Sequence, residues 1–148
     1  MAQSQTVRTS LLLRQLSETH NLHSFLQRNE NHMLGGSLAE YLRSKCAEKQ
    51  LVREQVILSA GIERTYGHQI FRGLRNPSRD KLLTLALCMG MTLPEVQQLL
   101  LLGQKSQLHP KVRRDTVFIY GFTKGLAVED VAEMLVDLQL RPMEEGTA

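Results

Sequence analysis

Four side chains that form directional hydrogen bonds lie close together in the middle of the chain. Arginine and glutamine can each make two hydrogen bonds to one base edge, and threonine can contact either a base or a phosphate. The sequence contains no phosphate loop of P-loop spacing, no GxSxG and no HExxH, so catalysis is not indicated and no catalytic residue is assigned. The residue types therefore indicate recognition of a polar ligand, and the four residues are Arg64, Thr65, His68 and Gln69.

The positive charge of the chain is concentrated around these four residues. The formal net charge is +3, but residues 37–82 hold nine Lys or Arg against five acids, whereas residues 83–148 hold six against eight. Such a concentration attracts phosphate groups, although a solvated basic surface is the alternative. The stretch from 64 to 79 has no acid at all and contains Arg64, Arg72, Arg75 and Arg79.

A short helix would place the polar side chains on a free face. On a helical wheel of roughly 100° per residue, Ile62, Tyr66 and Ile70 fall in one apolar stripe. Arg64 and His68 point the opposite way, and both Gly67 and Thr65 flank them. We expect the stripe to hold this helix on the domain and to leave its other face open.

Further helices are predicted on both sides of this one. Ser37 with Glu40, and Thr92 with Glu95, form two capping boxes that mark helix starts, and Ser78 is a third N-cap. In the central block we expect helices over about 38–49, 53–60, 63–72, 79–89 and 93–102.

The composition and the breaks predict an all-α protein in three blocks. Hydrophobic residues make up 42% but aromatic residues only 5%, which favours many small helices over a β-sandwich. Residues 1–36 form an N-terminal helical extension with two amphipathic pieces, ending at Gly35-Gly36; residues 37–102 form the central domain. Residues 103–148 form a helical hairpin with a tail, although 117–122 could be a strand by β propensity. No internal repeat is visible.

The segment VREQVILSAGIERTYGHQIFRGLRNPS resembles the helix-turn-helix of the Xre family, the phage-repressor-like DNA-binding domains. The matching residues occur in register without a gap, and they are Val56, Gly61, Ile62, Ile70, Gly73, Arg75, Pro77 and Ser78. The resemblance covers residues 37–102 in plan and implies five helices, with the third in the major groove. It implies base contacts from Arg64, Thr65, His68 and Gln69. It implies phosphate contacts from Arg53, Arg72, Arg75, Asn76 and Arg79.

Four positions depart from the family pattern. The family usually has Gln where Arg53 stands, a small residue at Ile57, an apolar residue at Gly67, and a polar or acidic residue at Phe71. The wheel places Phe71 near the exposed side of the helix. We expect the terminal blocks to cover it; the alternative is that Phe71, or the terminal helices, form a surface for a protein partner.

These observations predict a sequence-specific protein that binds double-stranded DNA, a transcriptional regulator. One recognition helix reads only a few base pairs, so we expect a homodimer on two half-sites. The hairpin at 110–138 is the expected dimer element, and the N-terminal block is the second choice. The main alternative is a helix-turn-helix fold used as a protein-interaction or scaffold module.

The remaining candidates for chemistry indicate no cofactor. Cys46 and Cys88 lie in helical apolar patterns, which predicts buried thiols in a reducing compartment. His20 and His23 are one helical turn apart with His32 beyond, but no fixed fourth ligand completes a zinc site. The apolar runs fall short of a signal sequence and of the roughly 20 residues that span a bilayer, so we expect a cytoplasmic protein without a membrane partner.

Overall fold

The computed structural model describes residues 8–30, 33 and 37–144 of the chain, and over these residues it contains only helices. The prediction of an all-α protein is therefore confirmed, and residues 117–122 belong to a helix and not to a strand. The helices are α1 (Thr9–Glu18), α2 (Leu22–Arg28), α3 (Leu38–Glu48), α4 (Arg53–Ser59), α5 (Arg64–Phe71), α6 (Arg79–Cys88), α7 (Leu93–Leu102), α8 (Arg113–Lys124) and α9 (Val128–Asp137).

The chain divides into two compact units, Met1–Gly35 and Gly36–Ala148. The first unit contains α1 and α2. Asn21 caps α2 as predicted, because its side chain accepts a hydrogen bond from the N–H of Ser24 at 3.1 Å. Phe25 is the buried residue of α2, whereas α1 buries none of its residues. The predicted break at Gly35-Gly36 lies outside the described residues.

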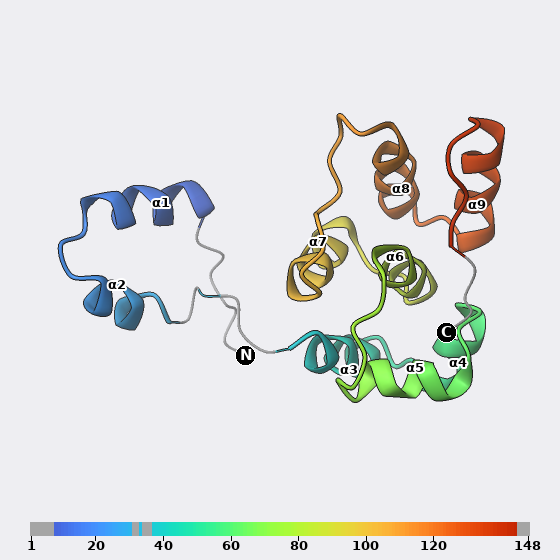
Figure 1. Ribbon diagram of the computed structural model, residues 1–148, viewed down its shortest axis with the longest axis horizontal. Coiled ribbons are helices and arrows are strands. Elements are labelled where there is room, and N and C mark those ends of the chain that lie inside the picture. The colour runs from blue at the N-terminus through green and yellow to red at the C-terminus, as the bar shows by residue number, and fades with distance from the viewer. Residues whose placement is uncertain (1–7, 31–32, 34–36, 145–148) are drawn as a thin grey trace. The chain divides into compact units, whose positions relative to one another are not determined.

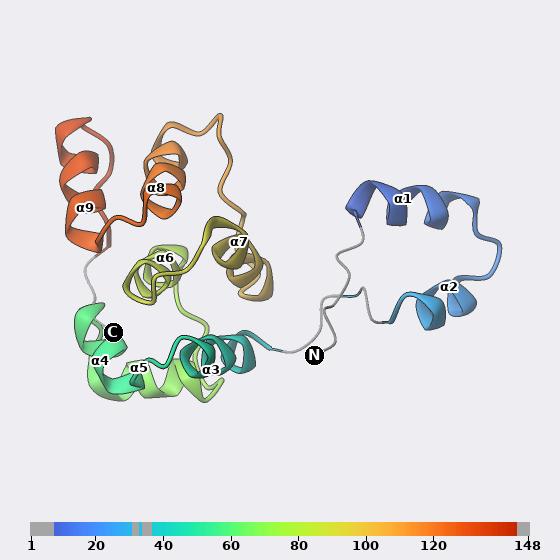
Figure 2. The ribbon, with the colours of Figure 1, turned by 180° about the vertical axis from the view of Figure 1, so that it is seen from behind.

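The second unit is built in three layers (Figure 1). Helices α3, α4 and α5 form one outer layer, α6 and α7 lie in the middle, and α8 and α9 form the other outer layer. The view from behind gives the same order (Figure 2). The middle helix α6 contacts α4 on one side and both α8 and α9 on the other. The predicted hairpin thus packs against the central helices.

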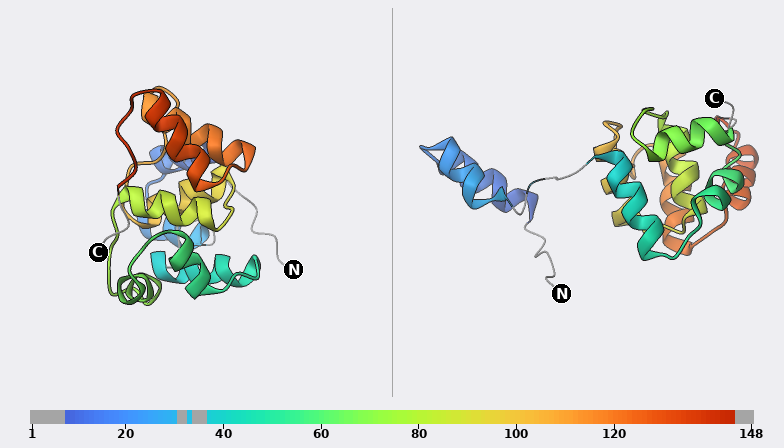
Figure 3. Two further views of the ribbon diagram at one scale, coloured as in Figure 1. Left: turned by 90° about the vertical axis from the view of Figure 1, so that its right-hand side faces the viewer. Right: turned by 90° about the horizontal axis from the view of Figure 1, so that it is seen from below.

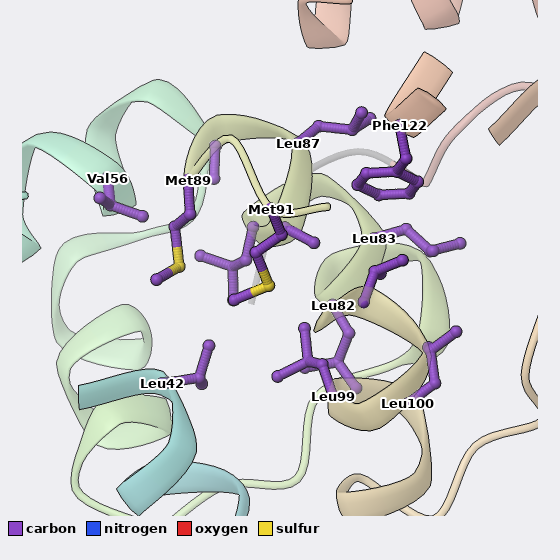
Figure 4. Packing of buried hydrophobic residues seen from close by; sticks show 14 of the residues in the cluster. Leu42, Val56, Leu82, Leu83, Leu87, Met89, Met91, Leu99, Leu100 and Phe122 are labelled. Carbon is purple, nitrogen blue, oxygen red and sulfur yellow. The ribbon is translucent and has the colours of Figure 1, made fainter. Parts of the chain in front are cut away.

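Helix α6 is buried almost all round because it lies between the two outer layers. Leu82, Leu85, Ala86 and Met89 were predicted to face inward, and all four are buried. Leu83 and Leu87 are buried as well. In the core, Leu42, Val56 and Met89 gather on one side of α6, while Phe122 of α8 lies beside Leu87 on the other (Figure 4). A helix that is apolar on every side is stable only in such a position.

Local sequence signals account for most helix boundaries. Ser37 and Thr92 form both predicted capping boxes, and the Ser78 side chain accepts the N–H of Lys81. Gly61 adopts a φ of 68° after α4 and Gly73 a φ of 82° after α5, a left-handed conformation that a residue without Cβ adopts at little cost. The predicted helices of the central block are therefore confirmed to within a residue or two.

The second unit contains a structural repeat of 35 residues, which the sequence analysis does not predict. Helix α9 has the same length as α7, and both of its ends lie 35 residues further along the chain: α7 runs from Leu93 to Leu102 and α9 from Val128 to Asp137. Helix α8 repeats α6 at the same shift but extends one residue further at each end. The left-handed residues that end the helices recur too, with Gly90 and Gln104 matched by Gly125 and Gln139. Few residue types are identical between the copies, which is why the sequence hides the duplication.

The two copies are joined by a reciprocal exchange of ion pairs. Arg79 of α6 donates from Nη1 and Nη2 to the two carboxylate oxygens of Asp115 at 2.9 and 3.0 Å. Arg114 of α8 donates in the same bidentate manner to Asp80 of α6, with both distances 2.9 Å. Bidentate pairs of this kind are among the strongest hydrogen bonds in proteins.

The surroundings of the two arginines repeat as well. Each arginine donates from Nε to one carbonyl oxygen and from Nη2 to the next, and the acceptors of the two copies are 35 residues apart in sequence. These acceptors are Ser106 and Gln107 for Arg79, and Arg141 and Pro142 for Arg114. The loop that follows each hairpin is thereby tied to the same pair of helices.

Both aspartates are buried acceptors of several hydrogen bonds. Asp115 accepts the N–H of His109 at 2.9 Å, and Asp80 accepts the N–H of Glu144 at 3.0 Å. Burial by itself would raise the pKa of each carboxyl group, but the hydrogen bonds and the charge of the arginines outweigh it. The pKa of each aspartate is therefore held below its ordinary value, so both are ionised at neutral pH.

Breaking one of these pairs should destabilise the second unit. Asp115→Asn removes the charge that compensates Arg79, whose side chain is only 23% exposed. We expect a loss of about 2–3 kcal/mol in the free energy of unfolding, a little below the value for a fully buried pair. Urea denaturation measures this loss.

The matched control for that variant is Asp137→Asn, which removes an acid from the exposed side of α9. It should change the free energy of unfolding by less than about 0.5 kcal/mol. Equal effects of the two substitutions would contradict the structural role of the exchange.

Candidate nucleic-acid interface

Helix α5 is held on the domain by its N-cap and its apolar stripe. The Glu63 carboxylate accepts the N–H groups of Thr65 and Tyr66 at 2.9 and 2.8 Å and so caps the first turn. Ile62 and Ile70 are buried, and Tyr66 is half-buried beneath the ammonium group of Lys81, which lies 5.1 Å from the ring centroid. The predicted stripe is confirmed, and α5 lies across α3 and α4 (Figure 3, right).

Gly67 is buried, which corrects its predicted place on the free flank of the helix. A Cβ atom at this position would overlap Cγ2 of Ile57, closer than real Cβ contacts come. Helices α4 and α5 therefore approach so closely that a glycine is required on one side. Ile57 and Gly67 thus form the two sides of one contact, with the large side chain on α4 and the residue without a side chain on α5.

Phe71 is fully buried, and the central helices themselves cover it. Helix α5 packs on α3 and α4, and the Arg53 guanidinium lies 5.1 Å from the Phe71 ring centroid. Arg43 of α3 donates a hydrogen bond to the Phe71 carbonyl. The expectation that the terminal blocks cover Phe71 is wrong. Helix α3 packs against the side of α5 that a helical wheel, which considers α5 alone, places near solvent. Phe71 offers no surface to a partner protein.

The predicted base-contacting residues lie along the outer side of α5. Arg64 keeps 78% of its side chain exposed and His68 28%, while Thr65 is exposed. Gln69 is half-buried, and its Oε1 accepts a hydrogen bond from Arg75 Nε at 2.9 Å. The structure therefore brings the four predicted side chains to one helix surface, as expected from their spacing.

Sequence reasoning missed Glu54, which reaches this surface from α4. Its Oε1 accepts a hydrogen bond from Arg64 Nε and lies 3.2 Å from His68 Nε2. The hydrogen bonds from Arg64 and His68 hold the pKa of Glu54 below its ordinary value. The signal that could have revealed it is its place in the first turn of α4, nearly two turns before the corner at Gly61 that leads to α5. Residues 64–79 contain no acid, but the fold places Glu54 of α4 beside them.

The predicted phosphate-contacting residues fall into two groups. Arg72, Arg75 and Asn76 are exposed, and Arg53 is half-buried against Phe71 at the start of α4. Arg79 instead directs its guanidinium to Asp115 and two carbonyl oxygens inside the repeat pair. We therefore remove Arg79 from the predicted phosphate contacts and assign it to the fold.

The histidines and cysteines singled out in the sequence form no metal-binding group within the described residues. No group of three His, Cys, Asp or Glu lies close enough together there to hold a metal ion, and His32 falls outside these residues. Cys46 is buried as predicted, while Cys88 is only partly buried. Burial raises the pKa of the Cys88 thiol to about 11.

Helices in the described part of the chain are all too short or too polar to cross a membrane. A comparison of the chain with protein-family models, curated proteins and solved structures finds no match. The functional interpretation therefore rests on the residues and their geometry.

The close contact between α4 and α5 can be tested by making the residue at position 57 small and the residue at position 67 large. Ile57→Ala should cost about 2–4 kcal/mol of unfolding free energy through the cavity it leaves, and Gly67→Val about 1–3 kcal/mol or more through overpacking. The double variant should recover part of both losses, because valine then fills the space that alanine vacates. Urea denaturation of the four proteins measures the coupling energy.

We expect that coupling to exceed about 1 kcal/mol in favour of the double variant. Val56→Ala, a neighbouring cavity variant on α4, is the control and should show no such recovery with Gly67→Val. Simple additivity of Ile57→Ala and Gly67→Val would contradict the inferred contact.

Proposed function

We propose that the protein binds double-stranded DNA in a sequence-specific manner and acts as a transcriptional regulator of the Xre type. The observation that carries this proposal is the outer side of α5. It presents Arg64 and Thr65 to solvent, with the partly exposed His68 beside them, on a helix whose opposite side is anchored in the core. A helix of this kind fits the major groove of B-DNA, where these side chains can reach base edges.

The arrangement of the central helices supports the proposal. Helices α3 to α7 give five helices in the order that the family resemblance implies, with α4 and α5 joined at the left-handed Gly61. The contact between Ile57 and Gly67 supports it further. It keeps α4 and α5 in tight apposition although both residues differ in size from the family pattern. Paired changes that preserve one contact are consistent with an inherited helix pair.

The proposed roles follow from exposure and existing contacts. Arg64 reads a guanine, and His68 and Thr65 contact the neighbouring positions. Gln69 contacts a base, and the hydrogen bond from Arg75 Nε holds the Gln69 amide in place. The remaining N–H groups of Arg75 donate to phosphate. Arg53, Arg72 and Asn76 complete the proposed phosphate contacts at the start of α4 and in the segment after α5.

The proposal is tested by selecting binding sequences from random duplexes and then measuring affinity between about 50 and 200 mM salt. We expect Arg75→Ala to weaken binding to all duplexes alike and to reduce the salt slope by about one unit. Arg64→Ala should instead cost about 1–3 kcal/mol on the selected sequence and relax preference at one base pair.

Lys111→Ala, which removes an exposed cation in the loop before α8, is the control and should change neither property. An affinity that does not respond to salt would favour the alternative, a protein-interaction or scaffold module. Identical behaviour of the Arg64 and Arg75 variants would refute the division into base and phosphate contacts.

We further propose a homodimer, but with a dimer element other than the one first expected. The apolar face of the hairpin α8–α9 is buried in its own chain, including Phe118 and Leu135 at 0% exposure. The first unit instead carries exposed leucines, and α1 and α2 are shorter than the roughly 12–15 residues that an isolated helix needs. Pairing with α1 and α2 of a second copy would cover these leucines, which are Leu11, Leu13, Leu16, Leu22 and Leu26.

The dimer can be tested in the full chain by charging this surface. The double variant Leu13→Glu with Leu16→Glu should be monomeric in sedimentation velocity at a concentration where the unmodified chain is dimeric. Its affinity for a two-half-site duplex should fall more than tenfold. Gln15→Glu with Ser17→Glu adds the same charge at polar positions of α1 and should remain dimeric. A dimer that survives the leucine substitutions would place the interface elsewhere.

A further inference from the structure

We propose that Glu54 is a positioning and specificity-determining residue, which holds Arg64 and His68 so that the protein prefers one base pair under α5. This inference rests on the proposed function and deepens it. Its starting point is the single carboxylate oxygen that meets both side chains.

The arrangement joins two helices at the centre of the proposed interface. Arg64 and His68 are four residues apart and therefore lie on the same side of α5. Glu54 approaches them from the first turn of α4, with its side chain 51% exposed. The carboxylate thus lies in the open, beside the strongly exposed Arg64 and the partly exposed His68. An ion pair in such a position adds little to stability.

The geometry instead suits orientation of a donor. Glu54 engages Nε of Arg64, which leaves Nη1 and Nη2 for the ligand. Those two groups can donate in parallel to O6 and N7 of guanine. A guanidinium fixed on one edge loses less conformational freedom on binding than a free arginine does. Glu54 therefore favours the bidentate contact over looser contacts with other bases.

The same carboxylate lowers affinity for DNA in general. A negative charge beside the groove repels the phosphate groups of every DNA sequence. It also pairs with Arg64, which could otherwise bind a phosphate group. Glu54 should therefore reduce non-specific binding while it increases discrimination. Glu54 thus lowers the affinity for non-specific DNA but raises the preference for one base pair. A residue that only stabilised the fold would produce neither effect.

The test compares Glu54→Gln and Glu54→Asp with the unmodified protein by gel shift. The probes are the selected duplex, the duplex changed at the one base pair where Arg64→Ala loses preference, and an unrelated duplex. Glu54→Gln removes the charge, and it should lower the preference at that base pair at least fivefold while it tightens binding to the unrelated duplex. Glu54→Asp keeps the charge but shortens the reach, and it should lower the preference without tightening non-specific binding.

The matched control is Glu133→Gln, the same charge change at an exposed position of α9. It should leave the preference unchanged. In addition, Glu54→Gln combined with Arg64→Ala should lose no more preference than Arg64→Ala alone, because Glu54 acts through that arginine. Thermal unfolding should show equal melting temperatures for the Glu54 variants, so that a change in binding reflects the interface.

The inference is overturned if Glu54→Gln behaves as Glu133→Gln does, or if it changes affinity for all three duplexes by one common factor. In both cases the proposed function stands, since the unmodified protein still prefers the selected duplex. If the unmodified protein shows no preference among duplexes, the proposed function fails and this inference fails with it.

Discussion

The reciprocal exchange between Arg79 and Asp115, and between Arg114 and Asp80, is the interaction on which the second unit depends. It fixes α6 against α8 with two bidentate ion pairs, four hydrogen bonds in all, and ties the loop after each hairpin to the same pair of helices. With α8 and α9 in position, the side of α6 that carries Leu83 and Leu87 is covered. Helix α6 can then be apolar on both sides and support the layer of α3, α4 and α5.

That support reaches the candidate interface through a short series of contacts. The core side of α6 packs beneath α4, where Val56 and Met89 lie together, and α4 in turn meets α5 at Ile57 and Gly67. The outer side of α5 contributes little to this packing, so its residues are free to serve a ligand. The arginines divide in the same way. Arg79 and Arg114 are used within the fold, whereas Arg64, Arg72 and Arg75 remain at the surface.

Much of the fold could be predicted because it depends on signals a few residues apart. The capping boxes at Ser37 and Thr92, the turn at Gly61 and the apolar stripe of α5 each involve neighbours within about one helical turn. The incorrect predictions at Gly67, Phe71 and Arg79 concern contacts between different helices. Gly67 and Phe71 are buried by α4 and α3, which a wheel of α5 alone does not contain. Arg79 was counted as a surface cation because its partner lies 36 residues away.

The sequence by itself therefore determined the helical class, the helix boundaries and the polar side of α5, since short-range spacing and capping specify these. Only the tertiary structure decided which charges are buried, what faces Gly67, and that Glu54 lies beside Arg64. The duplication of α6–α7 as α8–α9 also became visible only there. Its copies share backbone geometry and buried polar contacts more than residue types, and apolar side chains of different kinds fill equivalent core positions equally well.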